Sequence, residues 1–317
     1  MIRKIQYILV LFFCFQFVQS VAQTDICMTS HWYNRMGYNP AFIARTDYAY
    51  IFSNYRDQWV GVDGAPRVYT VQVSEYIHSL HSAVGLSFIN DKVGATQALN
   101  PMFNYAFQIV GKKEWSLSMG LAGGVFSRTV NGNLFEADVI NDPSINYNTQ
   151  EELKPDANAG IEFQNSSFIF GVSSTHLFSL NKPGETFLNS NHRYGYAIYK
   201  NNNIDAFYYK LGIMVVNRYN LTMVEGNAFI RFKHGTGLKS GPREIFDIGL
   251  SYRSSRQLTS MLGILLRPDL RVGYAYDHSF IKGYYTNSTH EFFIEYRIPN
   301  KLASTKPRCG KEIHWYH

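Results

Sequence analysis

The sequence predicts an all-β fold, a transmembrane antiparallel β-barrel of about 14 strands with both termini in the periplasm. Three observations favour this prediction. Of the 317 residues, 45% are hydrophobic and 16% aromatic, with 23 Tyr and 23 Phe, whereas only 17% are charged. Beyond residue 22 the sequence contains no run of about 20 apolar residues, the length that a spanning helix needs. Apolar and polar residues instead alternate with a period close to two, as in strands between lipid and a polar lumen.

Residues 1–22 have the features of a cleaved signal peptide. Arg3 and Lys4 form a basic start, residues 5–18 are largely apolar, and the small residues at 20–22 offer a cleavage site. The apolar run is short for a spanning helix, which disfavours a membrane anchor. Removal of the signal lowers the net charge from +6 to +4, which is too weakly basic to indicate a nucleic-acid partner.

The mature chain is interpreted as one domain with short ends. We expect residues 23–45 to form a periplasmic segment before the barrel, residues 46–298 to form the barrel, and residues 299–317 to form a basic periplasmic tail. Two cysteines, Cys27 and Cys309, remain after removal of the signal. An exported protein could oxidise them to a disulfide, but the sequence does not show that they meet.

Fourteen segments show the alternation. In chain order they are 47–56, 66–76, 82–90, 100–109, 114–127, 156–164, 167–175, 192–200, 205–216, 219–233, 244–254, 258–267, 269–277 and 289–297. In the clearest of them one face carries Phe103, Tyr105 and Phe107; Trp115, Leu117 and Met119; Phe246, Ile248 and Leu250; Leu270, Val272 and Tyr274; and Phe292, Ile294 and Tyr296. The opposite faces carry small, polar and charged residues.

A soluble β-sandwich also alternates, but its apolar face is the interior. Here one face is rich in large aromatics and the other mixes Gly, Ala and Ser with charges of both signs, as suits a narrow polar lumen. These charges could line an ion-conducting pore or pair to brace a closed lumen, and the sequence shows no separate plug domain. The inward charges are Glu162, Lys210, Glu225, Arg231, Asp247, Arg253, Arg271, Asp277, Glu295 and Arg297.

Loop lengths give a prediction of sidedness. With periplasmic termini, the longer connections should lie outside and the short turns in the periplasm. The expected outside loops are 57–65, 91–99, 128–155, 176–191 and 278–288, and the expected periplasmic turns are 111–113, 165–166, 201–203 and 268. The connections 217–218 and 234–243 do not fit this rule. The loop 128–155 is acidic, whereas 234–243 and the C-terminal tail are basic.

The stretch 38–74 is the part of the chain most dense in turn and strand-end signals. A proline holds the residue before it out of the helical region, which fixes a turn at Asn39. Gly61 and Gly64 permit positive φ in a tight loop, and Trp59 suits an interfacial anchor. A barrel rim with a loop brace and a docking surface for a partner are both compatible with this stretch. Its marked positions are Asn39, Pro40, Ala41, Arg56, Gln58, Trp59, Gly64 and Pro66.

Catalytic and metal chemistry find little support. His290 and Glu291, with Ser288 nearby, form the closest grouping to a hydrolase site, but adjacent residues of a strand point to opposite faces. A convergence of Cys309, His314 and His317 on zinc matches no strong ligand spacing. We expect no enzymatic activity, no cofactor and no metal.

Several short motifs occur in order along nearly the whole mature chain. They are His31-Trp32-Tyr33-Asn34, Asn39-Pro40-Ala41, Arg56-Asp57-Gln58-Trp59, Gly64-Ala65-Pro66, Asn90-Asp91-Lys92-Val93-Gly94, Ser174-Thr175-His176-Leu177, Gly273-Tyr274-Ala275-Tyr276-Asp277 and His290-Glu291. In these motifs the chain resembles the PorP/SprF membrane proteins of the type IX secretion and gliding machinery of Bacteroidota. It departs from that pattern at Ala44, where glycine is commoner, at Thr289, where a glycine-serine pair usually precedes His290-Glu291, and in the tail 309–317.

The resemblance implies an integral outer-membrane component of the type IX secretion system in a Gram-negative bacterium. It implies a role in the secretion or surface attachment of cargo adhesins with C-terminal sorting domains, and in anchoring the periplasmic machinery. The implied partners are outer-membrane lipids, periplasmic ring lipoproteins, a peptidoglycan-binding lipoprotein and the cargo adhesins. A passive outer-membrane channel is the alternative.

Overall fold

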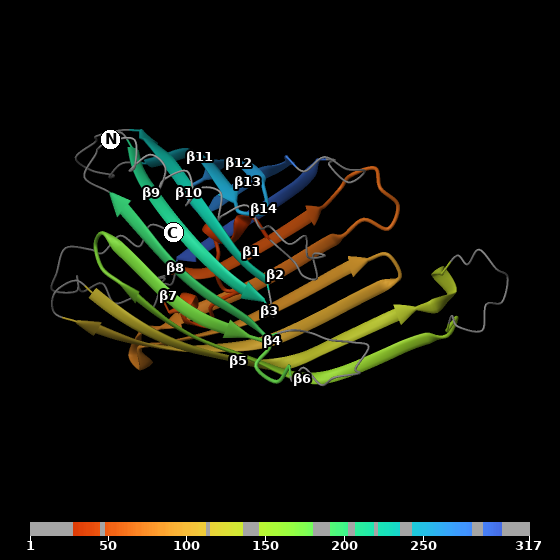
Figure 1. The fold of residues 1–317 in the computed structure, drawn as a ribbon. Helices are drawn as coiled ribbons and strands as arrows, with labels where there is room; N and C mark the ends of the chain where they lie inside the picture. Colours follow the sequence, from red (N-terminus) through yellow and green to blue (C-terminus); the bar gives the residue numbers. More distant parts are fainter. Residues whose placement is uncertain are drawn as a thin grey trace, which may run out of the picture.

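The described residues form a closed antiparallel barrel in which each strand pairs with its neighbours in sequence and β1 pairs with β14 (Figure 1). The computed structural model describes residues 28–44, 48–111, 115–135, 146–179, 191–201, 207–218, 221–234, 243–280 and 288–299. The predicted fold class and the strand number of 14 are confirmed. The predicted signal peptide and almost all of the predicted tail lie outside these residues, as do both mature cysteines.

The strands follow the predicted order closely. They are β1 (Tyr48–Asp57), β2 (Arg67–Ile77), β3 (Ser82–Val93), β4 (Thr96–Gly111), β5 (Trp115–Asn131), β6 (Thr149–Gln164), β7 (Phe168–Thr175), β8 (His192–Asn201), β9 (Phe207–Arg218), β10 (Leu221–His234), β11 (Arg243–Arg253), β12 (Gln257–Arg267), β13 (Leu270–Ser279) and β14 (Thr289–Pro299). Four short 3-10 helices accompany them, namely η1 (Ser30–Trp32), η2 (Pro40–Ile43), η3 (His78–Leu80) and η4 (Gly132–Leu134).

The largest differences from the prediction lie in β4, β5 and β6. The expected outside loop 91–99 is mostly strand, and the expected outside loop 128–155 is strand at both ends; the connections that remain are 94–95 and 132–148. These three strands have 16, 17 and 16 residues, whereas about 9–11 suffice to cross a membrane. The end of β5 and the start of β6 project beyond the other strands at the right of Figure 1. The sequence does not predict this extension, because a projecting sheet has no lipid-facing side and its apolar and polar residues therefore need not alternate.

The outer surface carries the apolar band that the alternation predicts. In β2, exposed and buried positions alternate along nearly the whole strand. Leu86 and Leu121, in β3 and β5, are 62% and 63% exposed, whereas Asn104 on the inner face of β4 is 1% exposed. The apolar face therefore points outward and the polar face inward, the reverse of a soluble sandwich.

The main correction concerns the segment before β1. We expected residues 23–45 to be a periplasmic segment outside the barrel, but residues 28–44 lie inside it and are almost entirely buried. Trp32 and Tyr33 pack in a cluster with Phe52, Phe229 and Phe293 of the wall. A second cluster joins this segment to β2, β3 and β4. These apolar side chains need a core, and the lumen provides it. Residues 28–44 are called the lumen segment below.

The lumen segment runs the length of the barrel. We call the end where β1 passes into β2 the loop end, and the end where β14 finishes the terminal end. The Met28 carbonyl lies 3.5 Å from the Nη2 atom of Arg253, the last residue of β11, and therefore at the loop end. Ala44 precedes β1, which starts at the terminal end. Met28 and Pro299 thus lie at opposite ends of the barrel.

Candidate functional site

The candidate functional site is the lumen of the barrel, which the lumen segment occupies. At the loop end, a cluster of carboxylate and guanidinium groups holds the segment. The backbone N–H groups of Thr29 and Ser30 donate to the two carboxylate oxygens of Glu291 at 2.9 and 2.7 Å. The Thr29 hydroxyl donates to Asp277 at 3.1 Å. Arg56 pairs with both carboxylates, at 2.6 Å to Asp277 and 3.0 Å to Glu291. Three residues marked in the sequence, Arg56, Asp277 and Glu291, therefore meet around the start of the lumen segment.

This cluster continues into a network of buried ion pairs on the wall. Arg253 donates to Glu225 at 2.7 Å, and Arg271 lies 3.1 Å from both Asp247 and Glu295. Strand side chains alternate between the two faces, so these charges share the inward face. The strand register places Arg231 opposite Asp247 and Arg271 opposite Glu295. A buried charge is tolerated only with partners. The predicted inward charges are thus largely confirmed as inward, and on this side of the lumen they pair.

Two aromatic side chains of η1 attach to the same network. The Trp32 Nε1–H group donates to Glu225 at 2.6 Å. The His31 Nε2 atom lies 3.4 Å from the same carboxylate, and its Nδ1 atom lies 2.7 Å from the Met28 carbonyl. Burial lowers the pKa of His31, although Glu225 opposes this shift. The neutral ring then donates from Nδ1 to the carbonyl.

The lumen segment also fits closely against glycines of β5, β6 and β9. A Cβ atom on Gly120 would lie 2.2 Å from the Ala41 nitrogen, and one on Gly160 would lie 2.1 Å from the Asn39 Oδ1 atom. A Cβ atom on Gly212 would lie 2.4 Å from the Trp32 ring. These distances are far inside van der Waals contact, so any larger residue would displace the segment.

The Asn39-Pro40-Ala41 turn attaches the lumen segment to the wall toward the terminal end. Asn39 has an extended backbone (φ −134°, ψ 106°), as expected before proline, and its Oδ1 atom caps η2 by accepting from the Ala41 N–H at 3.0 Å. Its Nδ2 group donates to the Ile161 carbonyl at 3.2 Å and to the Tyr196 hydroxyl at 2.9 Å. The motif is therefore a joint between the lumen segment and the wall.

Arg35 lies midway along the lumen segment and is buried. Its Nε atom is 3.5 Å from Glu162, and its guanidinium lies 4.9 Å from the centre of the Phe42 ring. The Tyr196 hydroxyl donates to the same carboxylate. Burial lowers the pKa of Arg35, and Tyr196 opposes the shift. This contact links the segment to the wall near the glycines.

The remaining marked residues of the first two hairpins form a rim at the loop end. The Gln58 N–H donates to the Pro66 carbonyl at 2.9 Å, and the Gly94 N–H donates to the Gly64 carbonyl at 2.8 Å. Gly64 has φ +71°, as predicted, and Trp59 has φ +55°. In the next hairpin the Asn90 Oδ1 atom accepts from Gln97 at 3.1 Å, and Asp91 lies opposite Ala98 of β4.

The last marked pair divides between the two faces of β14. Glu291 points into the lumen, whereas His290 accepts or donates at 2.6 Å with the Tyr274 hydroxyl on the other face. The absence of a hydrolase triad at this position follows from that geometry. Among the described residues, no group of three or more His, Cys, Asp or Glu side chains could hold a metal ion. No helix in the described ranges is long and apolar enough to cross a membrane.

Sequence reasoning missed the contacts of Thr29, Ser30, Trp32 and Arg35. One signal was available. The segment between the predicted signal peptide and the first strand contains many apolar and aromatic residues without strand alternation, and such residues need burial. The complementary signal, glycines at 120, 160 and 212 on inward faces, has meaning only once the segment lies against them.

The comparisons with known proteins assign the chain to a family. A family described as type IX secretion system membrane protein PorP/SprF matches residues 20–296, which include the lumen segment and nearly all of the barrel. The chain belongs to the PorP/SprF family. No curated protein matches this PorP/SprF chain.

Solved structures resemble this PorP/SprF chain in fold. The Ralstonia pickettii toluene transporter TbuX has a TM-score of 0.50 and 12% identity, over 88% of this chain and 95% of TbuX. The Pseudomonas putida toluene transporter TodX has a TM-score of 0.47 and 7% identity, over 87% of this chain and 95% of TodX. Acinetobacter baumannii Omp33 has a TM-score of 0.43 and 9% identity, over 79% and 97%. At these identities the likeness concerns the fold alone. The protein is a β-barrel membrane protein of the type IX secretion system.

Proposed function

We propose that this PorP/SprF protein is a closed, non-enzymatic scaffold of the type IX secretion system. It acts in the secretion or surface attachment of cargo adhesins with C-terminal sorting domains, and it anchors periplasmic parts of the machine. The observation that carries the proposal is the occupied lumen. A barrel filled by its own lumen segment offers its two rims and its outer surface to partners, rather than a wide aqueous path.

The contacts that hold the lumen segment against the wall support a closed barrel over a passive channel. Charges that line a conducting pore need water, whereas Glu225, Arg253 and Asp277 are buried and pair with each other or with the segment. Planar-bilayer recording of the purified full chain tests this point. We expect no large steady conductance, and we expect a variant without residues 28–44 to conduct. A large steady conductance of the full chain would instead favour the passive channel.

Connection lengths support an orientation. The loop end carries the connections 58–66, 94–95, 132–148, 176–191, 219–220, 254–256 and 280–288, whereas the terminal end carries 78–81, 112–114, 165–167, 202–206, 235–242 and 268–269. The four longest connections all lie at the loop end. Longer loops of such barrels usually face outward. We therefore place the loop end on the cell surface, toward the cargo adhesins. The terminal end then faces the periplasmic ring lipoproteins and the peptidoglycan-binding lipoprotein, for which Lys239, Arg243, Lys301, Lys306 and Arg308 supply positive charge.

Cysteine labelling of intact cells tests the orientation. Leu134 in η4 and Leu80 in η3 are 57% and 61% exposed, at opposite ends of the barrel. In a chain with Cys27 and Cys309 replaced by serine, a membrane-impermeant maleimide should label Leu134→Cys and leave Leu80→Cys unlabelled. The reverse pattern would invert the orientation.

Deletion of the gene tests the secretion role. We expect at least one surface adhesin to disappear from the cell surface and to return when the gene is supplied on a plasmid. Unchanged export of every surface adhesin in the deletion strain would contradict the proposal.

A further inference from the structure

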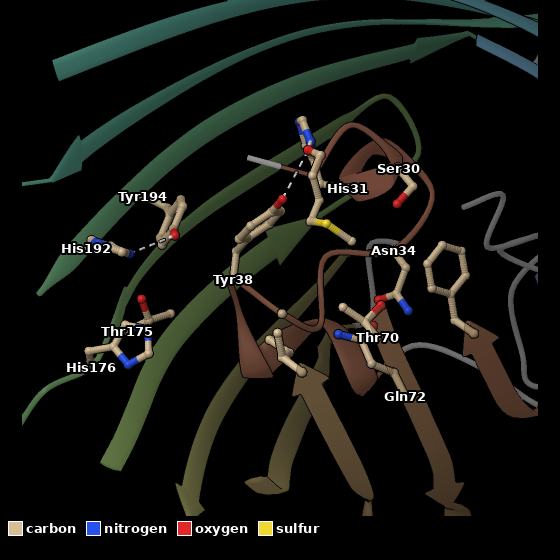
Figure 2. A pocket seen from close by; sticks show the side chains of 14 residues that line it. Ser30, His31, Asn34, Tyr38, Thr70, Gln72, Thr175, His176, His192 and Tyr194 are labelled. Carbon is tan, nitrogen blue, oxygen red and sulfur yellow. Dashed lines mark hydrogen bonds between the residues drawn. The ribbon is translucent and has the colours of Figure 1, made fainter. Parts of the chain in front are cut away.

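A second site lies beside the lumen segment, in a pocket between that segment and the wall formed by β1, β2, β3, β7 and β8. Figure 2 shows Tyr38 of the segment on the side of Thr175, His192 and Tyr194, whereas Asn34 lies on the other side of Tyr38, beside Thr70 and Gln72 of β2. The pocket has about 590 Å³ of empty space, including space continuous with solvent. Thr175 ends β7 and His192 begins β8, so the pocket lies toward the loop end.

The lining is polar but uncharged, apart from three histidines. No Asp, Glu, Lys or Arg is among the described residues that line it. The ion-pair network is built from β1, β10, β11, β13 and β14, and it lies on the other side of the lumen segment. Burial lowers the pKa of His31, which favours its neutral form. The His176 Nδ1 atom lies 2.7 Å from the Asp156 carboxylate, so the lining presents few charged groups to a ligand.

Several lining groups are buried and have unused hydrogen-bonding capacity. The Asn34 Nδ2 group and the Thr175 Oγ1 atom have no hydrogen-bond partner among the described residues. Asn34 and Thr175 are 5% and 3% exposed. Thr70 and Gln72 line the same pocket and are similarly buried. Buried polar groups without partners are rare and costly in native proteins, so such a set points to a ligand or ordered water.

Aromatic rings supply the apolar part of the pocket. The rings of Tyr38 and Tyr194 lie 5.0 Å apart at 35°, and Phe52 also lines the space. Hydroxyl and amide groups both donate and accept hydrogen bonds, which suits ligand hydroxyls, while an aromatic ring packs against C–H groups. The neighbouring wall strands pair on both edges at this level, so the pocket offers side chains rather than a free strand edge to a peptide.

We propose that this pocket is a binding site for an uncharged sugar. Asn34, Thr70, Gln72 and Thr175 bind the sugar hydroxyls, and the two tyrosine rings pack against its C–H faces. Binding does not depend on the secretion role. Only its exposure at the cell surface rests on the proposed orientation.

Saturation-transfer NMR of the purified full chain in a detergent without a sugar headgroup tests the proposal. The probes are maltose, N-acetylglucosamine, glucuronate and a capped alanine dipeptide. We expect signal for at least one neutral sugar, with at least tenfold weaker binding of glucuronate and none of the dipeptide. This selectivity needs no variant. Signal from the dipeptide in place of the sugars, equal binding of glucuronate, or no signal at all would overturn the proposal.

Variants locate the site. Asn34→Leu and Thr175→Val should each weaken binding of the neutral sugar at least tenfold. The matched control is Asn217→Leu, because Asn217 is at the loop end of β9, outside the pocket, and bonds to Thr222. Undiminished binding in both pocket variants would overturn the location, provided that they retain the heat-dependent gel mobility of the folded barrel. The location would also be overturned if Tyr194→Leu bound the neutral sugar as strongly as the native chain.

Discussion

The lumen segment meets two unlike walls. The charged wall, formed by β1, β10, β11, β13 and β14, holds it with carboxylates and guanidinium groups such as Glu291 and Arg56. The glycine wall, formed by β5, β6 and β9, holds it by close approach at Gly120, Gly160 and Gly212. At the charged wall, directional hydrogen bonds and ion pairs hold the segment, so removal of one partner weakens its attachment. At the glycine wall, the lack of side chains lets the segment approach closely, so an added side-chain atom displaces it.

The largest expected effect breaks the charged wall. Glu291→Ala leaves the Thr29 and Ser30 N–H groups and the Arg56 guanidinium without a main partner. Removing one member of a buried ion pair costs about 3–5 kcal/mol. We expect a loss of this size in the free energy of unfolding, measured by urea titration in lipid vesicles. Glu151→Ala, at an exposed position of β6, is the control with little effect. A loss below about 1 kcal/mol would mean that water replaces this carboxylate easily.

The next prediction breaks the glycine wall with one methyl group. In Gly120→Ala the new Cβ atom would lie 2.2 Å from the backbone nitrogen of Ala41, so the segment must move. Overpacking of this kind costs about 1–3 kcal/mol. The displaced segment should also become open to protease.

Gly123→Ala, in the same strand, is the matched control because nothing lies within 4 Å of its added Cβ atom. If both variants behave alike in urea titration and proteolysis, close approach does not hold the segment.

A smaller effect compares two asparagine caps. Asn39 caps η2 and also donates to Ile161 and Tyr196, whereas Asn131 caps the exposed η4 only. We expect Asn39→Ala to cost about 1–2 kcal/mol and Asn131→Ala about 0.5 kcal/mol. Urea titration of both variants measures the difference. Equal costs would show that the Asn39 Nδ2 group contributes nothing to holding the segment.

The smallest expected effect is a pH dependence at the charged wall. Burial lowers the pKa of His31 in the folded protein, so the unfolded chain binds a proton first as the pH falls below about 6.5. Stability should then decline, by at most about 1.4 kcal/mol per pH unit for this one group. Urea titrations between pH 8 and 5.5 measure the slope, and His31→Gln removes this contribution. An identical slope in His31→Gln would assign the pH dependence to other groups.

Much of the barrel wall was predictable from the sequence, but little of what fills the lumen was. A strand between lipid and lumen must alternate, so the order of the strands and their number of 14 follow from the pattern. Alternation also placed Glu291 inside and His290 outside. It failed where both faces of a strand meet solvent, at the projecting part of β6, because nothing there imposes a period of two.

The sequence by itself determined the barrel, its inward charges and the turn at Asn39-Pro40, since each depends on a local backbone preference or a short period. Only the tertiary structure decided that the lumen segment fills the barrel. Its contacts join Thr29 to Glu291 and Ala41 to the surface of Gly120, residues far apart in the chain. A glycine in the sequence has no side chain, but the sequence does not show which residue packs against it. That pairing exists only when the barrel closes around the segment.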